Sequence, residues 1–358
     1  IAAPLFAIPI FASAALLFFV EPMFAKMALP LLGGSPAVWN TCVVFFQAAM
    51  LAGYAYAHLL TRCLRLWQQV VLHVSLLLVV ALSLPVAIPE GWAPPVDRTP
   101  VPSLLGLLLA VLGGPFFAIS ATAPLLQRWF SYTRHSSAAD PYFLYAASNA
   151  GSMVALLGYP FVVEPLWTLS SQSRGWMAGY LVLAGLIAAC AASVLRGHAR
   201  EHAKRSIAPT SQNGDSAAAT LGWRRRARWV ALAFVPSSLM LAVTTFVSTD
   251  VAAVPLLWIA PLTLYLLSFV MTFVSRPILP ERLGSSLMVV LLLPLTVTMT
   301  LHLREPLLLL IPLHLAAFFA CALVLHRELA RDRPEPRHLT EFYLWLSAGG
   351  VPGGVFYT

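Results

Sequence analysis

Charged side chains are scarce in this sequence. Only 10% of its 358 residues are Asp, Glu, Lys or Arg, whereas 59% are hydrophobic. A soluble domain carries about 25% charged residues, so the chain has too little polar surface to cover a globule in water. Its apolar residues instead come in blocks of about twenty, the length that a helix needs to cross a bilayer core of about 30 Å. Because lipid offers no partners to backbone amides, each block must satisfy its own. The sequence therefore predicts an all-α integral membrane protein.

Motifs for catalysis, cofactors and metals are also missing. The four cysteines (Cys42, Cys63, Cys190 and Cys321) are scattered and include no CxxC pair, which predicts neither a disulfide framework nor a zinc site. No Walker motif, nucleophile elbow or HExxH sequence is present. We therefore expect no cofactor and no metal, and we do not expect this chain by itself to be an enzyme.

The apolar blocks predict ten full membrane spans and the start of an eleventh. Their approximate positions are 4–30, 37–60, 67–88, 104–126, 142–163, 175–195, 229–248, 252–274, 283–301, 306–325 and 342 onward. With the N-terminus in the cytoplasm, most of the 22 Lys and Arg residues fall in loops on the cytoplasmic side. Basic loops face the cytoplasm as a rule. We therefore predict a protein of the inner (cell) membrane whose N-terminus is cytoplasmic.

A polar segment divides the spans into two groups. Residues 1–195 hold six spans, residues 196–228 form a basic linker, and residues 229–358 hold the rest. The basic residues at the end of this linker are Arg224, Arg225, Arg226 and Arg228. Arginines beside a membrane span attract anionic lipid. We expect lipid, and no nucleic acid, to be their partner, although the pI is near 9.6.

The two groups of spans look related. Residues 125–151 align without a gap on residues 324–350, so that Arg128 meets Arg327 and Gly151 meets Gly350. PAVW (36–39) and PLLW (255–258) are a second pair of similar segments. Two parallel six-helix halves joined by a cytoplasmic linker resemble the plan of the major facilitator superfamily. That plan is a two-half helical bundle with six spans in each half. Compared with it, this chain lacks a twelfth span.

Three stretches resemble a narrower family. They are FVEPMFAKMALPLLGGSPAVWNTCVVFFQAAMLAGYAYAH (19–58), SNAGSMVALLGYPFVVEP (148–165) and VPSSLMLAVTTFVSTDVAAVPLLWIAPLTLYLLSFV (235–270). They are similar to the membrane region of the fused major-facilitator/spermidine synthase proteins. The resemblance implies a major-facilitator-like architecture and an association with polyamines. It implies no catalytic residue, because nothing here resembles the soluble aminopropyltransferase-like domain that often follows in that family.

Acidic residues near the span ends are the first site candidates, because ionisable groups at membrane depth are costly. Glu21 and Lys26 flank Pro22 in the first span, where they could bind a solute or pair with each other at the rim. Glu164 stands before a proline at the end of span five, and could simply mark a helix end. Asp250 follows span seven, where it could cap span eight. Our hypothesis is that Glu21, Glu164 and Asp250 surround an outward-opening vestibule for a cationic solute such as a polyamine.

Polar residues within the spans complete the predicted site. Asn149 on span five and Thr245 on span seven could contact substrate, or could mediate helix packing, as small polar residues do in membranes. Three functions remain open from the sequence. The chain could be a transporter, a non-transporting module that anchors protein partners or a soluble domain in a membrane complex, or the membrane part of an aminopropyltransferase-like enzyme.

Overall fold

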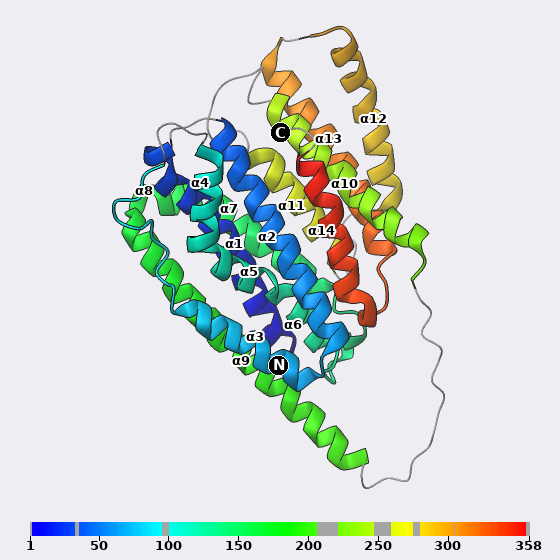
Figure 1. The fold of residues 1–358 in the computed structure, drawn as a ribbon. Coiled ribbons are helices and arrows are strands. Elements are labelled where there is room, and N and C mark those ends of the chain that lie inside the picture. The colour runs from blue at the N-terminus through cyan, green and yellow to red at the C-terminus, as the bar shows by residue number, and fades with distance from the viewer. Residues whose placement is uncertain are drawn as a thin grey trace.

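The computed structural model describes residues 2–32, 36–94, 100–205, 221–246, 259–274, 280–303 and 305–355. Within these ranges the chain is a bundle of helices without β-strands (Figure 1). The helices are α1 (Ala2–Leu32), α2 (Pro36–Cys63), α3 (Leu66–Ala81), α4 (Pro100–Leu108), η1 (Leu109–Gly113), α5 (Gly114–Ser120), α6 (Thr122–Phe130), η2 (Ser136–Ala139), α7 (Phe143–Gly158), η3 (Tyr159–Val163), α8 (Glu164–Leu166), α9 (Leu169–Arg205), α10 (Trp223–Phe246), α11 (Ile259–Phe273), α12 (Glu281–Thr300), α13 (Leu307–Arg331), η5 (Pro336–His338) and α14 (Leu339–Val355).

Several of these helices have membrane-spanning length, either alone or joined end to end. In the described ranges, eight helical stretches are long and apolar enough to cross a bilayer. They are Ala3–Leu32, Thr41–Cys63, Val101–Phe130, Phe143–Leu166, Leu169–Gly197, Trp223–Phe246, Leu283–Thr300 and Leu307–Arg331. The prediction of an all-α integral membrane protein is thereby confirmed. The count of ten full spans and an eleventh stays a prediction, because α3 and α11 are apolar but shorter.

Prolines distort two of the passes without ending them. The stretch Val101–Phe130 contains a π-helical turn, η1, shortly before Pro115, which has no N–H for the carbonyl of Val111. The stretch Phe143–Leu166 has a π-helical turn, η3, around Pro160, which likewise leaves the carbonyl of Leu156 without its usual donor. Such turns are frequent at functional sites.

The predicted end of the third span was wrong. The third span was expected to reach residue 88, but α3 ends at Ala81. Pro85 and Pro89 follow, and the conformations that proline imposes on itself and on the preceding residue oppose an α-helix. The linker at 196–228 stays a prediction: α9 continues to Arg205, although its candidate membrane span ends at Gly197, and α10 begins at Trp223. Residues 206–220 lie outside the described ranges.

Glycines bring two pairs of helices into backbone contact. A Cβ atom at Gly151 of α7 would lie 2.2 Å from the carbonyl oxygen of Phe11 in α1. A Cβ at Gly349 of α14 would lie 2.4 Å from the carbonyl oxygen of Val230 in α10. Small residues at such positions are the usual means of close helix packing in membranes. The sequence alignment paired Gly151 with Gly350, one residue away from the glycine that makes the second contact.

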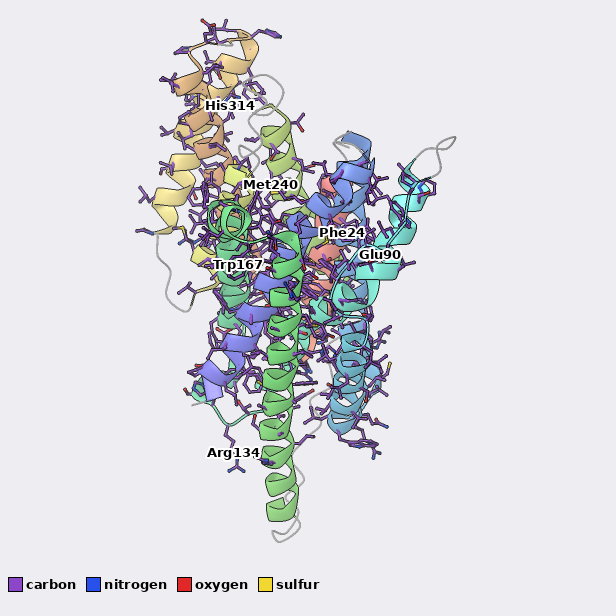
Figure 2. The ribbon with its side chains drawn as sticks, turned by 90° about the vertical axis from the view of Figure 1, so that its left-hand side faces the viewer. Phe24, Glu90, Arg134, Trp167, Met240 and His314 are labelled. Atoms are coloured by element: carbon purple, nitrogen blue, oxygen red, sulfur yellow. The ribbon has the colours of Figure 1, made fainter. Side chains whose placement is uncertain are left out.

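Helices α1 to α9 meet helices α10 to α14 chiefly along two helix pairs. α2 packs against α14, and α7 packs against α11. In Figure 1, α14 runs beside α2, although the two helices are far apart in sequence. The loops at residues 131–142 and 332–338 share one end of the bundle, which we call the arginine-rich end. Figure 2 shows Arg134 at this end and Glu90 toward the opposite end.

Candidate functional site

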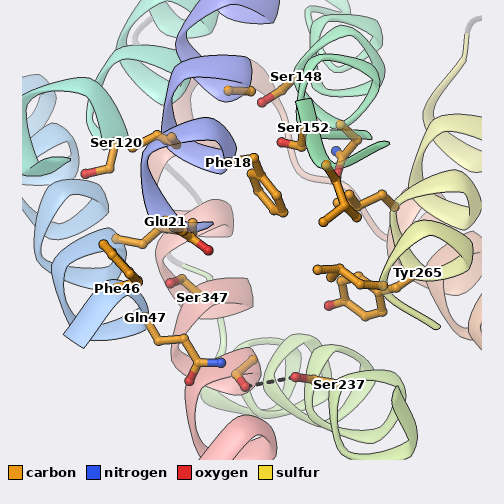
Figure 3. A pocket seen from close by; sticks show the side chains of 18 of the residues that line it. Phe18, Glu21, Phe46, Gln47, Ser120, Ser148, Ser152, Ser237, Tyr265 and Ser347 are labelled. Atoms are coloured by element: carbon orange, nitrogen blue, oxygen red, sulfur yellow. Dashed lines mark hydrogen bonds between the residues drawn. The ribbon is translucent and has the colours of Figure 1, made fainter. Parts of the chain in front are cut away.

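A cavity of about 360 Å³ lies between the two groups of helices. Helices α1, α2, α5, α6 and α7 supply one wall, and α10, α11 and α14 supply the other. Its polar and aromatic lining residues are Ser13, Phe18, Glu21, Phe46, Gln47, Tyr54, Ser120, Tyr145, Ser148, Asn149, Ser152, Ser237, Thr244, Tyr265, Phe269 and Ser347. Figure 3 shows Glu21 and Phe18 on one side of this space and Tyr265 on the opposite side.

Glu21 is the one formally charged side chain among the described lining residues. It lies well inside the first pass, since α1 continues to Leu32. Glu21 forms no hydrogen bond or ion pair with any residue that the structure describes. Phe18, three residues earlier on the same helix face, also lines the cavity. Pro22 also has no N–H for the carbonyl of Phe18, which leaves this main-chain acceptor without its usual helical donor.

Lys26 does not pair with Glu21. Its ammonium group forms an ion pair with Glu164, which lies 138 residues away in the sequence at the start of α8. The side chains of Lys26 and Glu164 are 41% and 37% exposed, and neither lines the cavity. The rim pair that the sequence allowed therefore exists, but it uses a different carboxylate and leaves Glu21 uncompensated.

Of the other predicted site residues, Asn149 lines the cavity and Thr245 does not. Asn149 lines the cavity and donates from Nδ2 to the carbonyl oxygen of Tyr145 at 2.8 Å, so its Oδ1 is left as an acceptor. Thr245 is not among the lining residues, whereas its neighbour Thr244 is. Asp250 lies outside the described residues. The structure thus brings Glu21 and Asn149 to one cavity and places Lys26 and Glu164 beyond it.

Hydroxyl groups of the lining present acceptors to the cavity. Four of them donate their protons to main-chain carbonyls: Ser13 to Ile10 (2.8 Å), Ser120 to Phe117 (2.9 Å), Ser237 to Gly350 (3.0 Å) and Thr244 to Met240 (2.7 Å). A hydroxyl that has donated its proton keeps two lone pairs. The side-chain oxygen of Gln47 is a further acceptor, buried without a partner among the described residues. Since no described lining residue is Lys, Arg or His, the wall favours a ligand rich in donors.

Aromatic side chains were the part of the site that sequence reasoning missed. Rings from four helices line the cavity: Phe18, Phe46, Tyr54, Tyr145, Tyr265 and Phe269. A signal for them existed, because Phe46 and Tyr54 of α2 stand eight residues apart, as do cavity-facing positions along one helix face. Aromatic residues at helical spacing are also common in any apolar core, so the pattern alone did not mark a site.

An aromatic layer separates the cavity from the arginine-rich end. The ring of Tyr145, which lines the cavity, lies 4.8 Å from the ring of Tyr343 in α14. The hydroxyl of Tyr343 donates to Gln127 Oε1 at 2.7 Å, and both residues are buried. These contacts join the two groups of helices directly beneath the cavity.

A polar layer follows at the arginine-rich end itself. Arg333 pairs with Asp140 at 2.6 Å, and the hydroxyl of Tyr142 donates to the carbonyl oxygen of Pro334 at 2.9 Å. His58 of α2 also contacts Thr340 of α14 at 3.2 Å between Nδ1 and Oγ1. The bundle is therefore closed at this end by contacts between its two groups of helices.

The arginines predicted to bind lipid are largely used within the protein. Three form ion pairs: Arg225 with Asp332 (3.0 Å), Arg226 with Glu341 (2.6 Å) and Arg228 with Glu328 (2.8 Å). Arg224 is exposed and has no such partner among the described residues. The contact with anionic lipid stays a proposal, and Arg224 is the residue on which it now depends.

Comparison with known proteins identifies the fold. No protein-family model and no curated protein sequence matches the chain. Its structure is similar to that of XylE, a proton:xylose symporter of the major facilitator superfamily solved with 6-bromo-6-deoxy-D-glucose bound. The TM-score is 0.57 at 12% sequence identity, over 99% of this chain and 86% of that chain. The chain is therefore an integral membrane protein with a major-facilitator-like fold. Its resemblance to the fused spermidine synthase proteins stays a prediction.

Proposed function

We propose that this protein is a secondary transporter for a small organic cation. The observation that carries the proposal is Glu21, a carboxylate at membrane depth that lines a cavity between the two groups of helices and has no partner among the described residues. Such a group is unfavourable unless a cation or a proton compensates it. The cavity volume of about 360 Å³ falls in the range of about 300–1,000 Å³ that is usual for small-molecule sites.

Each residue has a role in this proposal. Glu21 binds the ammonium group of the solute through charge-assisted hydrogen bonds, which are stronger than neutral ones. Asn149 Oδ1 and the lining hydroxyls accept further hydrogen bonds. Lys26 and Glu164 form an ion pair outside the site. Polyamines, the class that the resemblance implies, are one kind of cation to test, and the xylose carried by XylE represents a neutral class.

We also propose an orientation for the transporter in an inner membrane. The arginine-rich end faces the cytoplasm, because basic loops are retained on that side. In the present conformation this end is closed by the Arg333–Asp140 and Tyr343–Gln127 contacts. Release of the solute to the cytoplasm requires both contacts to break, as the two groups of helices rock around the cavity.

Uptake into proteoliposomes tests the proposal. Purified protein is reconstituted, and uptake of radiolabelled 2-phenylethylamine, spermidine and xylose is compared with uptake by empty liposomes. At least one of the two cations should accumulate with wild-type protein and fail to accumulate with Glu21→Gln. Glu164→Gln is the matched control, because it also neutralises a carboxylate but lies outside the cavity, and it should retain uptake.

Three results would contradict the proposal. Equal cation uptake by wild type and Glu21→Gln would show that Glu21 is not part of the site. Uptake of xylose alone would assign the cavity to a neutral solute. Uptake of none of the three by correctly folded protein would favour the alternative that the chain is a non-transporting membrane module.

A further inference from the structure

The charge of the cavity limits the charge of its ligand. Among the described lining residues, the balance is one carboxylate and no cationic side chain. A monovalent cation is compensated by Glu21 alone, whereas a second or third ammonium group on the same molecule would enter a membrane-embedded cavity without a counter-charge. Uncompensated charge at this depth is costly, so the cavity discriminates against polycations.

The walls limit the shape of the ligand. Beside Glu21, the ring of Phe18 faces the cavity on α1, and Tyr265 stands across the space on α11 (Figure 3). The ring of Phe18 is partly buried against the cluster of Leu156, Ile259 and Leu266, and it contacts no other aromatic ring of the described residues. Aromatic faces attract ammonium groups and also bury apolar surface. A ligand that uses both needs a charged nitrogen and an apolar body.

We propose that the cavity binds a monovalent organic ammonium ion with an apolar or aromatic body, and that it excludes polyamines. The inference rests on the proposed function, because it uses the same cavity. The nitrogen lies between the Glu21 carboxylate and the ring of Phe18, where the Phe18 carbonyl and the lining hydroxyls accept its hydrogen bonds. The apolar body packs against the rings of the opposite wall, which include Tyr265 and Phe269.

Equilibrium binding to the purified full chain in nanodiscs tests this inference separately from transport. The probes are 2-phenylethylamine, which is a monovalent cation near neutral pH, its neutral isostere 2-phenylethanol, and spermidine, which carries three ammonium groups. The amine should bind at least ~10-fold more tightly than the alcohol or spermidine, since an opposite buried charge strengthens a hydrogen bond by that order.

Variants measure separately how much the Glu21 charge and the Phe18 ring contribute to amine binding. Glu21→Gln should weaken amine binding by ~10-fold or more while leaving alcohol binding unchanged, and Glu21→Asp, which keeps the charge, should retain part of the affinity. Phe18→Leu keeps an apolar side chain but removes the aromatic face, and should weaken amine binding by roughly 3- to 10-fold. Glu164→Gln should have no effect.

The outcomes separate this inference from the proposed function. Spermidine binding as tight as that of the amine, and dependent on Glu21, would retain a cation site and overturn the restriction to monovalent ligands. A large loss with Asp250→Asn would overturn it as well, because a second carboxylate would then contribute. Equal affinity for the amine and the alcohol would show that the ligands bind through their apolar bodies alone, without a contribution from the ammonium charge. Binding of no cation would contradict both proposals.

Discussion

Replacement of Gly151 by alanine is expected to separate the two helices that the glycine holds together. The added methyl group would lie 2.2 Å from the carbonyl oxygen of Phe11 and 3.1 Å from its Cα. Both are main-chain atoms within α1, so no side-chain rotation can relieve the clash, and α1 and α7 must move apart. Overpacking of this kind costs about 1–3 kcal/mol.

A gain in helix propensity offsets part of this cost. Alanine is favoured over glycine in a helix interior by about 1 kcal/mol, so the net loss of unfolding free energy for Gly151→Ala should be roughly 0–2 kcal/mol. Gly158 of the same helix is the matched control, because a Cβ there meets nothing within 4 Å. Gly158→Ala should be neutral or slightly stabilising.

Unfolding of the purified variants in a denaturant series would measure the difference between them. Gly349→Ala provides a second case, since its Cβ would approach the carbonyl oxygen of Val230 to 2.4 Å, and it should be destabilised by a similar amount. If Gly151→Ala unfolds at the same denaturant concentration as Gly158→Ala, the backbones of α1 and α7 are not in contact and the packing argument is wrong.

Two further predictions concern the arginine-rich end. Tyr343→Phe removes the hydrogen-bond donor to Gln127 Oε1. Because this buried oxygen would then have no donor, the unfolding free energy should fall by about 1–3 kcal/mol. An unchanged unfolding free energy for Tyr343→Phe would contradict the assignment. Cys63 is exposed at the end of α2, so an impermeant maleimide should label it in lysed but not in intact cells. Labelling of intact cells that disappears in Cys63→Ser would reverse the proposed orientation.

Properties that depend on neighbouring residues along the chain could be predicted from the sequence. Block length and hydrophobicity indicated the all-α membrane fold, because a helix in lipid satisfies its backbone within a single segment. Glu21 and Asn149 were recognisable as candidates because each is a polar residue in an apolar block. The same local reasoning failed at the end of the third span, where it read apolar residues as helix and underestimated the effect of Pro85.

Which groups meet was decided by the tertiary structure alone. Lys26 is five residues from Glu21 in the sequence, yet its partner is Glu164, 138 residues away. By charge alone, Lys26 could pair with either carboxylate. Its partner depends on how far apart the groups lie in the folded protein, and the sequence does not state that distance. The absence of a partner for Glu21 among the described residues, the rings around it, and the pairing of Arg225 with Asp332 all arise in this way. The sequence by itself determined a membrane bundle with a costly carboxylate in its first span. The packing of distant helices determined that this carboxylate lines a cavity uncompensated, because only that packing brings the walls of the cavity together.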